Sequence, residues 1–328
     1  MDFRKSLGGA LFLSLLFVGS LSAQSVAEGV SASVIVVVGA PGADEFSEPF
    51  IAQADAWKAI SDVAGARIVT IGREGESTEE NSDHDRLQAA LAAEDRDGLV
   101  PLWLVLIGHG TFNGKEAKFN LRGPDVTSDE LAGWLARISR PLAIIDTSSS
   151  SAPFLNTLSG LNRVVVTATR SGYEQNYTRF GRYFVEALLT PESDLDKDGE
   201  ISLLEGFLYG SAQLAEFYST EGRLASEHPL IDDNGDKLGT PPDWYRGIRA
   251  TTQSADGTPA DGPRAKQFLL IRSEAEQQLS PEIRAERDAL ELEIETLRAR
   301  RAGLTDDEYY GRLEAILLRI AAVYESTD

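Results

Sequence analysis

Two stretches of sequence decide the fold: PLWLVLIGHG at residues 101–110 and PLAIIDTSSSS at residues 141–151. Each begins with proline, continues as an apolar run, and then changes abruptly to glycine and histidine or to hydroxyl residues. Runs of this length and composition predict strands that are buried on both faces of a sheet. Because reactive groups gather at the carboxyl ends of parallel strands, we expect the two polar ends to carry the function.

Similar apolar runs occur before and after these two stretches, at Val34–Val38, Arg67–Ile71 and Val164–Val166. The segments between the runs have helical periodicity, with apolar positions at Phe50, Ala54, Trp57, Ile60, Leu87, Leu91, Leu131, Trp134, Leu135 and Ile138. Alternation of buried strands with amphipathic helices predicts an α/β fold with a doubly wound, mostly parallel sheet. We assign this domain to residues 24–248.

The chain after this domain changes character. Residues 249–266 are rich in Thr, Ser, Gly, Pro and Asp, which predicts an exposed linker. The apolar run Phe268–Ile271 is compatible with an edge strand that returns to the main sheet. The rest of residues 267–328 predicts a helical hairpin that turns near Gly303, with caps at Ser280 and Pro281 for the first helix and at Thr305 and Glu308 for the second.

Both helices of the hairpin have an apolar stripe. The stripe residues are Leu290, Ile294 and Leu297 in the first helix and Leu313, Ile316, Leu317, Ile320 and Tyr324 in the second. Apolar stripes must be buried somewhere, so we expect the hairpin either to pack as a small appendage or to mediate oligomerisation or partner docking.

The amino terminus has the layout of a secretory signal peptide, which we assign to residues 1–23. Arg4 and Lys5 precede an apolar stretch from Leu7 to Leu21, and cleavage after Ala23 is expected. A retained anchor is the alternative, but the apolar stretch is short for a membrane span. We therefore expect export to the periplasm or outside the cell, and no stable membrane insertion after cleavage.

The chain is strongly acidic, with 31 Lys and Arg against 52 Asp and Glu and a net charge of -21. Such a chain repels phosphate backbones and anionic lipid, which disfavours nucleic acid and membrane surfaces as partners. Calcium and basic substrates are better candidates, and a protein or peptide ligand is possible. The sequence contains no cysteine, which excludes a thiol nucleophile, a thiolate metal site and a disulfide.

The two polar strand ends resemble the caspase/legumain clan of peptidases. In that clan a histidine and a cysteine form the catalytic pair, and the backbone N–H after the histidine helps to bind the oxyanion. The resemblance implies His109, Gly110 and Ser148 as the catalytic positions, with Ser148 where the family has cysteine. For the substrate pocket it implies Asp146, Arg170, Glu174 and Asn176.

Serine in place of cysteine changes the expected chemistry. A thiol ionises readily, whereas a serine hydroxyl must pass its proton to a well-aligned base during attack. We therefore expect a non-hydrolytic binding or scaffold protein, and the alternative is a secreted serine hydrolase that uses Ser148 with His109. The sequence shows no obvious third residue to orient His109, although Asp125 or Asp129 could do so. The run Ser148–Ser151 also fits an anion-binding nest, or an N-cap for a helix that begins near Phe154.

The sequence DLDKDGEISLLE at residues 194–205 fills the key positions of a twelve-residue EF-hand loop. The implied calcium ligands are Asp194, Asp196, Asp198, the Glu200 carbonyl, Ser202 and Glu205, while Gly199 permits the tight turn. An acidic loop without calcium is the alternative. If calcium binds, a calcium-stabilised structural protein that assembles through its helical tail is a further possible function.

A second acidic loop, Ile231–Asp236, has the same Asn-Gly chemistry without the full spacing. It is either another cation site or, as we expect, a solvated turn. His84 and His228 have no metal-ligand companions, and we assign them no role.

Overall fold

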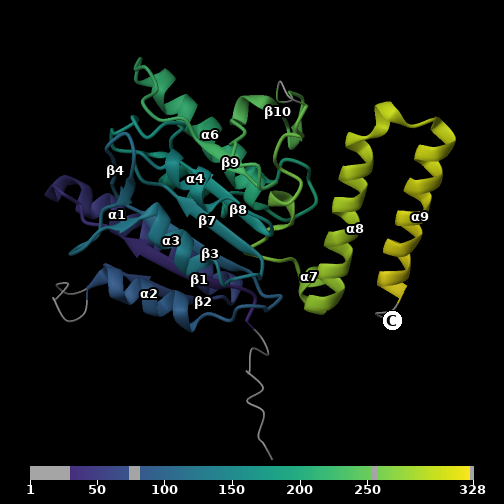
Figure 1. Cartoon of the computed structure of the whole chain (residues 1–328), viewed down its shortest axis with the longest axis horizontal. Coiled ribbons are helices and arrows are strands. Elements are labelled where there is room, and N and C mark those ends of the chain that lie inside the picture. The colour runs from purple at the N-terminus through teal and green to yellow at the C-terminus, as the bar shows by residue number, and fades with distance from the viewer. Residues whose placement is uncertain (1–29, 74–81, 253, 255–256, 326–328) are drawn as a thin grey trace, which may run out of the picture.

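The computed structural model describes residues 30–73, 82–252, 254 and 257–325, so the predicted signal peptide at residues 1–23 lies outside the described residues. Figure 1 shows an α/β core with a helical hairpin beside it. The core is built on a six-stranded sheet of order β2-β1-β3-β7-β8-β9. Its strands are β1 (Ser33–Val38), β2 (Arg67–Ile71), β3 (Leu102–Ile107), β7 (Leu142–Asp146), β8 (Arg163–Thr167) and β9 (Leu230–Asp232).

The strand directions confirm the predicted doubly wound, mostly parallel sheet. Strands β1, β2, β3, β7 and β8 pair in parallel with their neighbours, and the unpredicted edge strand β9 pairs antiparallel to β8. The predicted runs end within one or two residues of the observed strands. Each run is bounded by residues that disfavour continued strand, which is why its limits could be read from the sequence.

Helices cover both faces of the sheet, because alternate strand residues point to opposite sides. One face is covered by α1 (Asp44–Ala64), α5 (Phe180–Ala187) and α6 (Leu203–Thr220), and the other by α2 (Asp83–Ala93), α3 (Ser128–Leu135) and α4 (Ala152–Leu158). On β1, Val34 and Val36 face the first layer, while Ile35 and Val37 face the second. The predicted apolar helix positions are buried, except that Trp134 is only partly covered.

A small antiparallel sheet follows β3 directly and fixes the chain after His109. Its strands are β4 (Gly110–Phe112), β5 (Ala117–Phe119) and β6 (Val126–Thr127). The His109 carbonyl accepts a hydrogen bond from Asn120 N at 2.9 Å, beside the pairing of Gly110 with Phe119. The turn at the end of β3 is therefore held by an element that the sequence did not reveal.

The predicted exposed linker is wrong in its second half. A short ribbon of β10 (Tyr245–Arg246) and β11 (Arg249–Ala250) opens the segment, but Asp261 and Ala265 are buried. Asp261 Oδ1 accepts from Asp233 N, and Asp233 Oδ2 accepts from Ala265 N, both at 2.8 Å. We name these two hydrogen bonds the Asp233–Asp261 clasp. Burial and the nearby Asp233 carboxylate raise the pKa of Asp261 to about 8.

Two further expectations for this region are wrong. Asp232 and Asp233 are buried, so the loop 231–236 is not simply a solvated turn. The run Phe268–Ile271 does not join the main sheet: it follows the 3-10 turn Ala265–Gln267 and makes an isolated bridge between Leu269 and Ser202, at the start of α6. Its apolar side chains are instead used to cover the first helical layer, because Phe268 and Leu270 belong to that core.

The helical hairpin is present as predicted, with α7 (Glu274–Gln278), α8 (Pro281–Ala299) and α9 (Asp306–Glu325). Both caps form: Ser280 Oγ accepts from Ile283 N, and Thr305 exchanges hydrogen bonds with Glu308. The remaining 3-10 turns are Pro191–Ser193, Pro242–Trp244 and Arg301–Gly303. Among the described residues, no helix has both the length and the hydrophobicity needed to span a bilayer.

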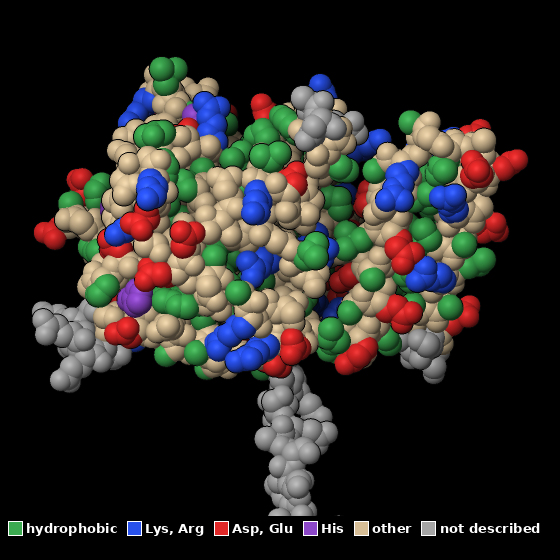
Figure 2. Space-filling model, in the orientation of Figure 1, with side chains coloured by type: hydrophobic (Ala, Val, Ile, Leu, Met, Phe, Trp, Pro, Cys, Tyr) green, Lys and Arg blue, Asp and Glu red, His purple; other side chains and the backbone are tan. Residues whose placement is uncertain are grey.

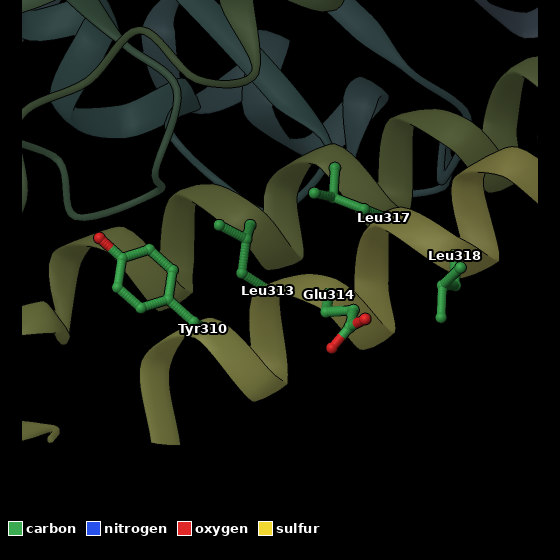
Figure 3. A pocket seen from close by; sticks show the side chains of 5 residues that line it. All are labelled: Tyr310, Leu313, Glu314, Leu317 and Leu318. Carbon is green, nitrogen blue, oxygen red and sulfur yellow. The ribbon is translucent and has the colours of Figure 1, made fainter. Parts of the chain in front are cut away.

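The apolar stripe of α9 is covered only in part. Val323 is buried, but Leu317 is 49% exposed and Tyr324 is 40% exposed. Figure 3 shows Tyr310, Leu313, Glu314, Leu317 and Leu318 on this side of α9. Within this chain, Leu290, Ile294 and Leu297 of α8 are buried, whereas part of the α9 stripe is left exposed, so the expected choice between a packed appendage and an oligomerisation or docking module stays open.

Candidate functional site

The two polar strand ends lie at one edge of the sheet. Strands β3 and β7 are parallel neighbours, with Leu106 opposite Asp146. His109 follows β3 and Ser148 follows β7, so both lie at the carboxyl edge of adjacent strands. This is where the alternation of elements predicted them, and it is the edge at which α/β sheets place their ligand sites.

The hydroxyl of Ser148 is already engaged. Ser148 Oγ donates to Asp146 Oδ1 at 2.6 Å, and Ser148 N donates to the same oxygen at 3.0 Å. The residue is 0% exposed. A nucleophile must approach the substrate carbon to about 3 Å in a reactive geometry, which a buried oxygen bonded to a carboxylate does not allow.

Asp146 is a buried acid inside the core of this edge. Burial raises its pKa to about 6, although the hydrogen bonds from Ser148 lower it. Asp146 Oδ2 is buried and has no hydrogen-bond partner among the described residues. A carboxylate that is only half satisfied inside a protein is costly, which is the physical origin of the raised pKa.

The ring of His109 lies in an aromatic environment. Its centroid is 4.8 Å from the Phe46 ring and 5.2 Å from the Phe50 ring, both in edge-on geometry. Burial lowers the pKa of His109, while a hydrogen bond with the Pro41 backbone raises it. The histidine is consequently favoured in its neutral form near pH 7.

No triad forms around His109. Among the described residues it has no hydrogen bond or ion pair with Ser148, Asp125 or Asp129. Asp125 Oδ1 instead accepts from Leu121 N at 3.1 Å. Asp125, one of the two residues that could have oriented His109, instead closes the local turn at residues 121–125.

The backbone N–H of Gly110, which the resemblance implies as an oxyanion donor, is also engaged. It donates to Ser149 Oγ at 3.2 Å, and the same hydroxyl donates to the Gly110 carbonyl at 3.2 Å. A Cβ at Gly110 would lie 2.3 Å from the Ser149 carbonyl oxygen and 3.0 Å from Ser148 Oγ. Position 110 therefore requires glycine for the two strand ends to approach each other.

Of the implied pocket residues, Arg170 and Glu174 are in contact, whereas Asp146 and Asn176 differ in burial. Asp146 is buried beneath the edge, whereas Arg170 and Asn176 are exposed on the loop after β8. Arg170 Nε lies 3.5 Å from Glu174 Oε1, and that carboxylate also lies 2.6 Å from His228 Nδ1. No sequence pattern signals the contact with His228, because it joins residues 54 positions apart.

The serine run neither caps α4 nor forms an open nest. Ser151 makes no side-chain cap, and its hydroxyl lies 3.1 Å from Thr169 Oγ1. Thr169 Oγ1 accepts from Ala152 N at 3.0 Å and so takes the capping role that we expected of the serines. Ser150 has a positive φ of 57°, and its backbone N donates to the Glu174 carbonyl. The hydrogen-bonding groups of the run are thus largely taken up by internal bonds.

The acidic loop at residues 194–205 brings three carboxylates together. One oxygen each of Asp194, Asp196 and Asp198 lies within 4.8 Å of the others. Gly199 adopts a positive φ of 90°, as the tight turn requires, and Asp194 Oδ1 is buried without a hydrogen-bond partner among the described residues. Burial, followed by neighbouring carboxylates, raises the pKa of Asp196. These features fit a divalent cation with oxygen ligands.

At the other end of the acidic loop, the side chains of Ser202 and Glu205, which we expected to be calcium ligands, make hydrogen bonds within the protein. Glu205 Oε1 accepts from Leu195 N, and Glu205 Oε2 accepts from Ser202 N, both at 2.8 Å. Ser202 and Glu205 together form the capping box of α6. Glu200 Oε1 accepts from Ser273 N at 2.6 Å, which ties the loop to the segment before the hairpin.

No family model matches the sequence, and no curated protein matches it. Among solved structures, the Drosophila initiator caspase Dronc is similar with a TM-score of 0.40 and 12% identity, over 72% of this chain and 95% of that chain. Caspase-1 from Spodoptera frugiperda has a TM-score of 0.40 and 12% identity, over 62% and 87%. A protein from Geobacter sulfurreducens has a TM-score of 0.39 and 10% identity, over 64% and 98%.

The three similarities all have TM-scores of 0.40 or lower and identities of 12% or lower. Similarity at this level concerns the path of the chain and carries nothing about activity or about the role of Ser148.

Proposed function

We propose that the protein is a non-hydrolytic binding or scaffold protein on a caspase-like core, exported from the cytoplasm and carrying a calcium loop. The observation that carries this proposal is the buried hydrogen bond from Ser148 Oγ to Asp146 Oδ1. A working serine nucleophile needs its hydroxyl to face a base and the substrate together. Here the hydroxyl faces a buried acid.

The surroundings of Ser148 support the same conclusion. The N–H of Gly110 is bonded to Ser149, and His109 is held among aromatic rings. Catalysis would require all three groups to exchange their partners at once. The Ser148 bond to the Asp146 carboxyl group alone contributes about 1.5–3 kcal/mol when that group is ionised, so breaking it lowers the population of any reactive arrangement.

A fluorophosphonate probe tests the proposal directly, since it labels serine nucleophiles that are activated by a base. We expect wild-type protein and Ser148→Ala to show the same background labelling. Ser219→Ala serves as a matched control, because Ser219 is exposed on α6 and remote in sequence from the two strand ends. Labelling of wild type and of Ser219→Ala, lost only in Ser148→Ala, would establish the serine hydrolase instead.

Calcium binding is the second part of the proposal. It is supported by the three converging aspartates, the turn at Gly199 and the unpartnered oxygen of Asp194. Asp194, Asp196 and Asp198 would hold the cation, while Glu205 anchors the loop to α6. When bound, the cation would neutralise carboxylates that now repel one another.

A further inference from the structure

A groove separates the core from the helical hairpin at the edge of the sheet opposite Ser148. Its volume is about 1050 Å³, at the upper end of the range of about 300–1,000 Å³ that ligand sites occupy. Figure 2 shows the surface hollowed between the core and the hairpin. One wall contains Ser31, Pro101, Pro141 and Asn162, which lie just before the starts of β1, β3, β7 and β8. We name this feature the amino-edge groove.

The hairpin side of the groove is fastened to the core, so the groove has a defined shape. Arg272 Nη1 donates to the Ser31 carbonyl at 2.9 Å. Gln267 Nε2 donates to the Asp288 carbonyl of α8 at 2.8 Å. These bonds join the segment before α7 to the first residues of the core and to α8.

The groove is positively charged, although the chain has a net charge of -21. Arginines 264, 272, 284 and 287 line it. Arg287 is neutralised by ion pairs with Glu276 and Asp288. Among the described residues, Arg272 and Arg284 have no carboxylate within ion-pair distance; their guanidinium groups donate to backbone carbonyls. Burial, and then the charge of Arg284, lowers the pKa of Arg272, while the more distant carboxylates of Asp288, Glu276 and Glu200 raise it.

Two guanidinium groups without a carboxylate partner in one groove favour an anion. The planar fork of arginine matches a carboxylate with two parallel hydrogen bonds, and bound negative charge would relieve the repulsion between Arg272 and Arg284. Leu99, Leu279 and Leu292 add apolar wall to the same groove. The Gln277 amide nitrogen donates to the Arg272 carbonyl at 2.8 Å, which leaves its oxygen as an acceptor. Together with the side-chain amide of Gln278, it supplies hydrogen-bonding groups suited to a peptide backbone.

We propose that the amino-edge groove binds a short extended peptide, whose terminal carboxylate is held by Arg272 and Arg284 and whose apolar side chains lie against the leucines. A fatty acid has the same head group, but it would leave the Gln278 amide and the Gln277 amide oxygen without a partner. The inference rests on the proposed binding function and deepens it, at a site remote from Ser148. Labelling of Ser148 by a fluorophosphonate would overturn the non-hydrolytic function without affecting this groove.

The test uses the full mature chain and two fluorescein-labelled pentapeptides of sequence Leu-Ala-Val-Ala-Leu, one with a free carboxyl terminus and one amidated. Fluorescence anisotropy should show saturable binding of the free-acid peptide and at least tenfold weaker binding of the amide. Arg272→Gln and Arg284→Gln should each weaken binding of the acid at least tenfold. Arg300→Gln is the matched control and should bind like wild type, since Arg300 is exposed beyond the end of α8.

Arg272 and Arg284 also bond to backbone carbonyls, so thermal melts of the variants accompany the titrations. If either glutamine variant unfolds, Arg272→Lys and Arg284→Lys keep the charge, and the comparison of acid with amide on wild type still decides the question. Equal binding of the two peptides, or wild-type affinity in both folded glutamine variants, would overturn the proposal. Binding of palmitate with no binding of either peptide would overturn it in favour of a lipid ligand.

Discussion

Replacing Asp146 by asparagine should remove a pH-dependent penalty from the folded state. The pKa of Asp146 is raised from 3.8 to about 6 by burial. A carboxyl group whose folded pKa is raised destabilises the native state when it ionises, so its cost is absent below pH 3.8 and complete above pH 6. The difference of about 2.2 between the two pKa values corresponds to about 3 kcal/mol.

The prediction concerns how the difference between the two proteins changes with pH. In the D146N variant, the side-chain carbonyl oxygen still accepts from Ser148, and the amide nitrogen replaces Oδ2, which has no partner among the described residues. That exchange changes the free energy of unfolding of D146N by an amount that does not depend on pH. Between pH 4 and pH 7, the free energy of unfolding of wild type should therefore fall by about 2.4 kcal/mol relative to D146N, because a small part of the full penalty is already present at pH 4.

Urea unfolding followed by circular dichroism at pH 4, 5, 6 and 7 measures this change. Other buried acids, such as Glu227 and Asp261, are present in both proteins and cancel in the difference. Ser148→Ala gives a matched comparison: it removes a hydrogen bond that lowers the pKa of Asp146, so its fall in stability should extend to higher pH. A difference between wild type and D146N that stays constant with pH would refute the reasoning.

The site and the acidic loop lead to three further tests. Gly110→Ala should lower the free energy of unfolding, measured in urea, by about 1–3 kcal/mol, because its Cβ would meet the Ser149 carbonyl. Gly133→Ala is the control: its Cβ would have no atom within 4 Å, so it should be neutral or stabilising. Equal effects of the two substitutions would contradict the close approach of the strand ends. In this cysteine-free chain, S148C should react with iodoacetamide at least tenfold more slowly than S219C, and equal rates would mean that the crevice opens. Calcium at a hundredfold above its dissociation constant should raise the midpoint of thermal unfolding by about 5–10 °C. The double variant D196N/D198N should lose this shift. The same wild-type midpoint with calcium and with chelator would exclude the site.

The sequence was sufficient for the sheet and its helical layers because each signal is local. Apolar runs bounded by proline or glycine identify β3 and β7 within a residue or two, and helical spacing identifies the buried faces of α1 to α3. The antiparallel edge strand β9 escaped prediction because Leu230–Asp232 is too short to show a pattern.

The location of the site could be predicted from the sequence, but the hydrogen-bond partners of its side chains could not. The motifs placed His109 and Ser148 at one edge, and parallel pairing of β3 with β7 puts them there. Nothing in the sequence tells whether the hydroxyl of Ser148 turns toward the histidine or toward Asp146. That choice is made by three-dimensional packing, as is the contact of Glu174 with His228.

The Asp233–Asp261 clasp bears on how this chain tolerates insertions. Asp261 and the backbone at Ala265 are fixed to Asp233 at the end of β9. The position of the hairpin therefore depends on the chain from Asp261 onward and not on the length of the segment between Ala250 and Asp261. Doubling the length of a flexible loop costs only about 0.6 kcal/mol in closure entropy. Extra residues placed between Ala250 and Asp261 should therefore leave the hairpin docked, whereas a single insertion between Asp261 and Arg272 would shift every bond that holds it.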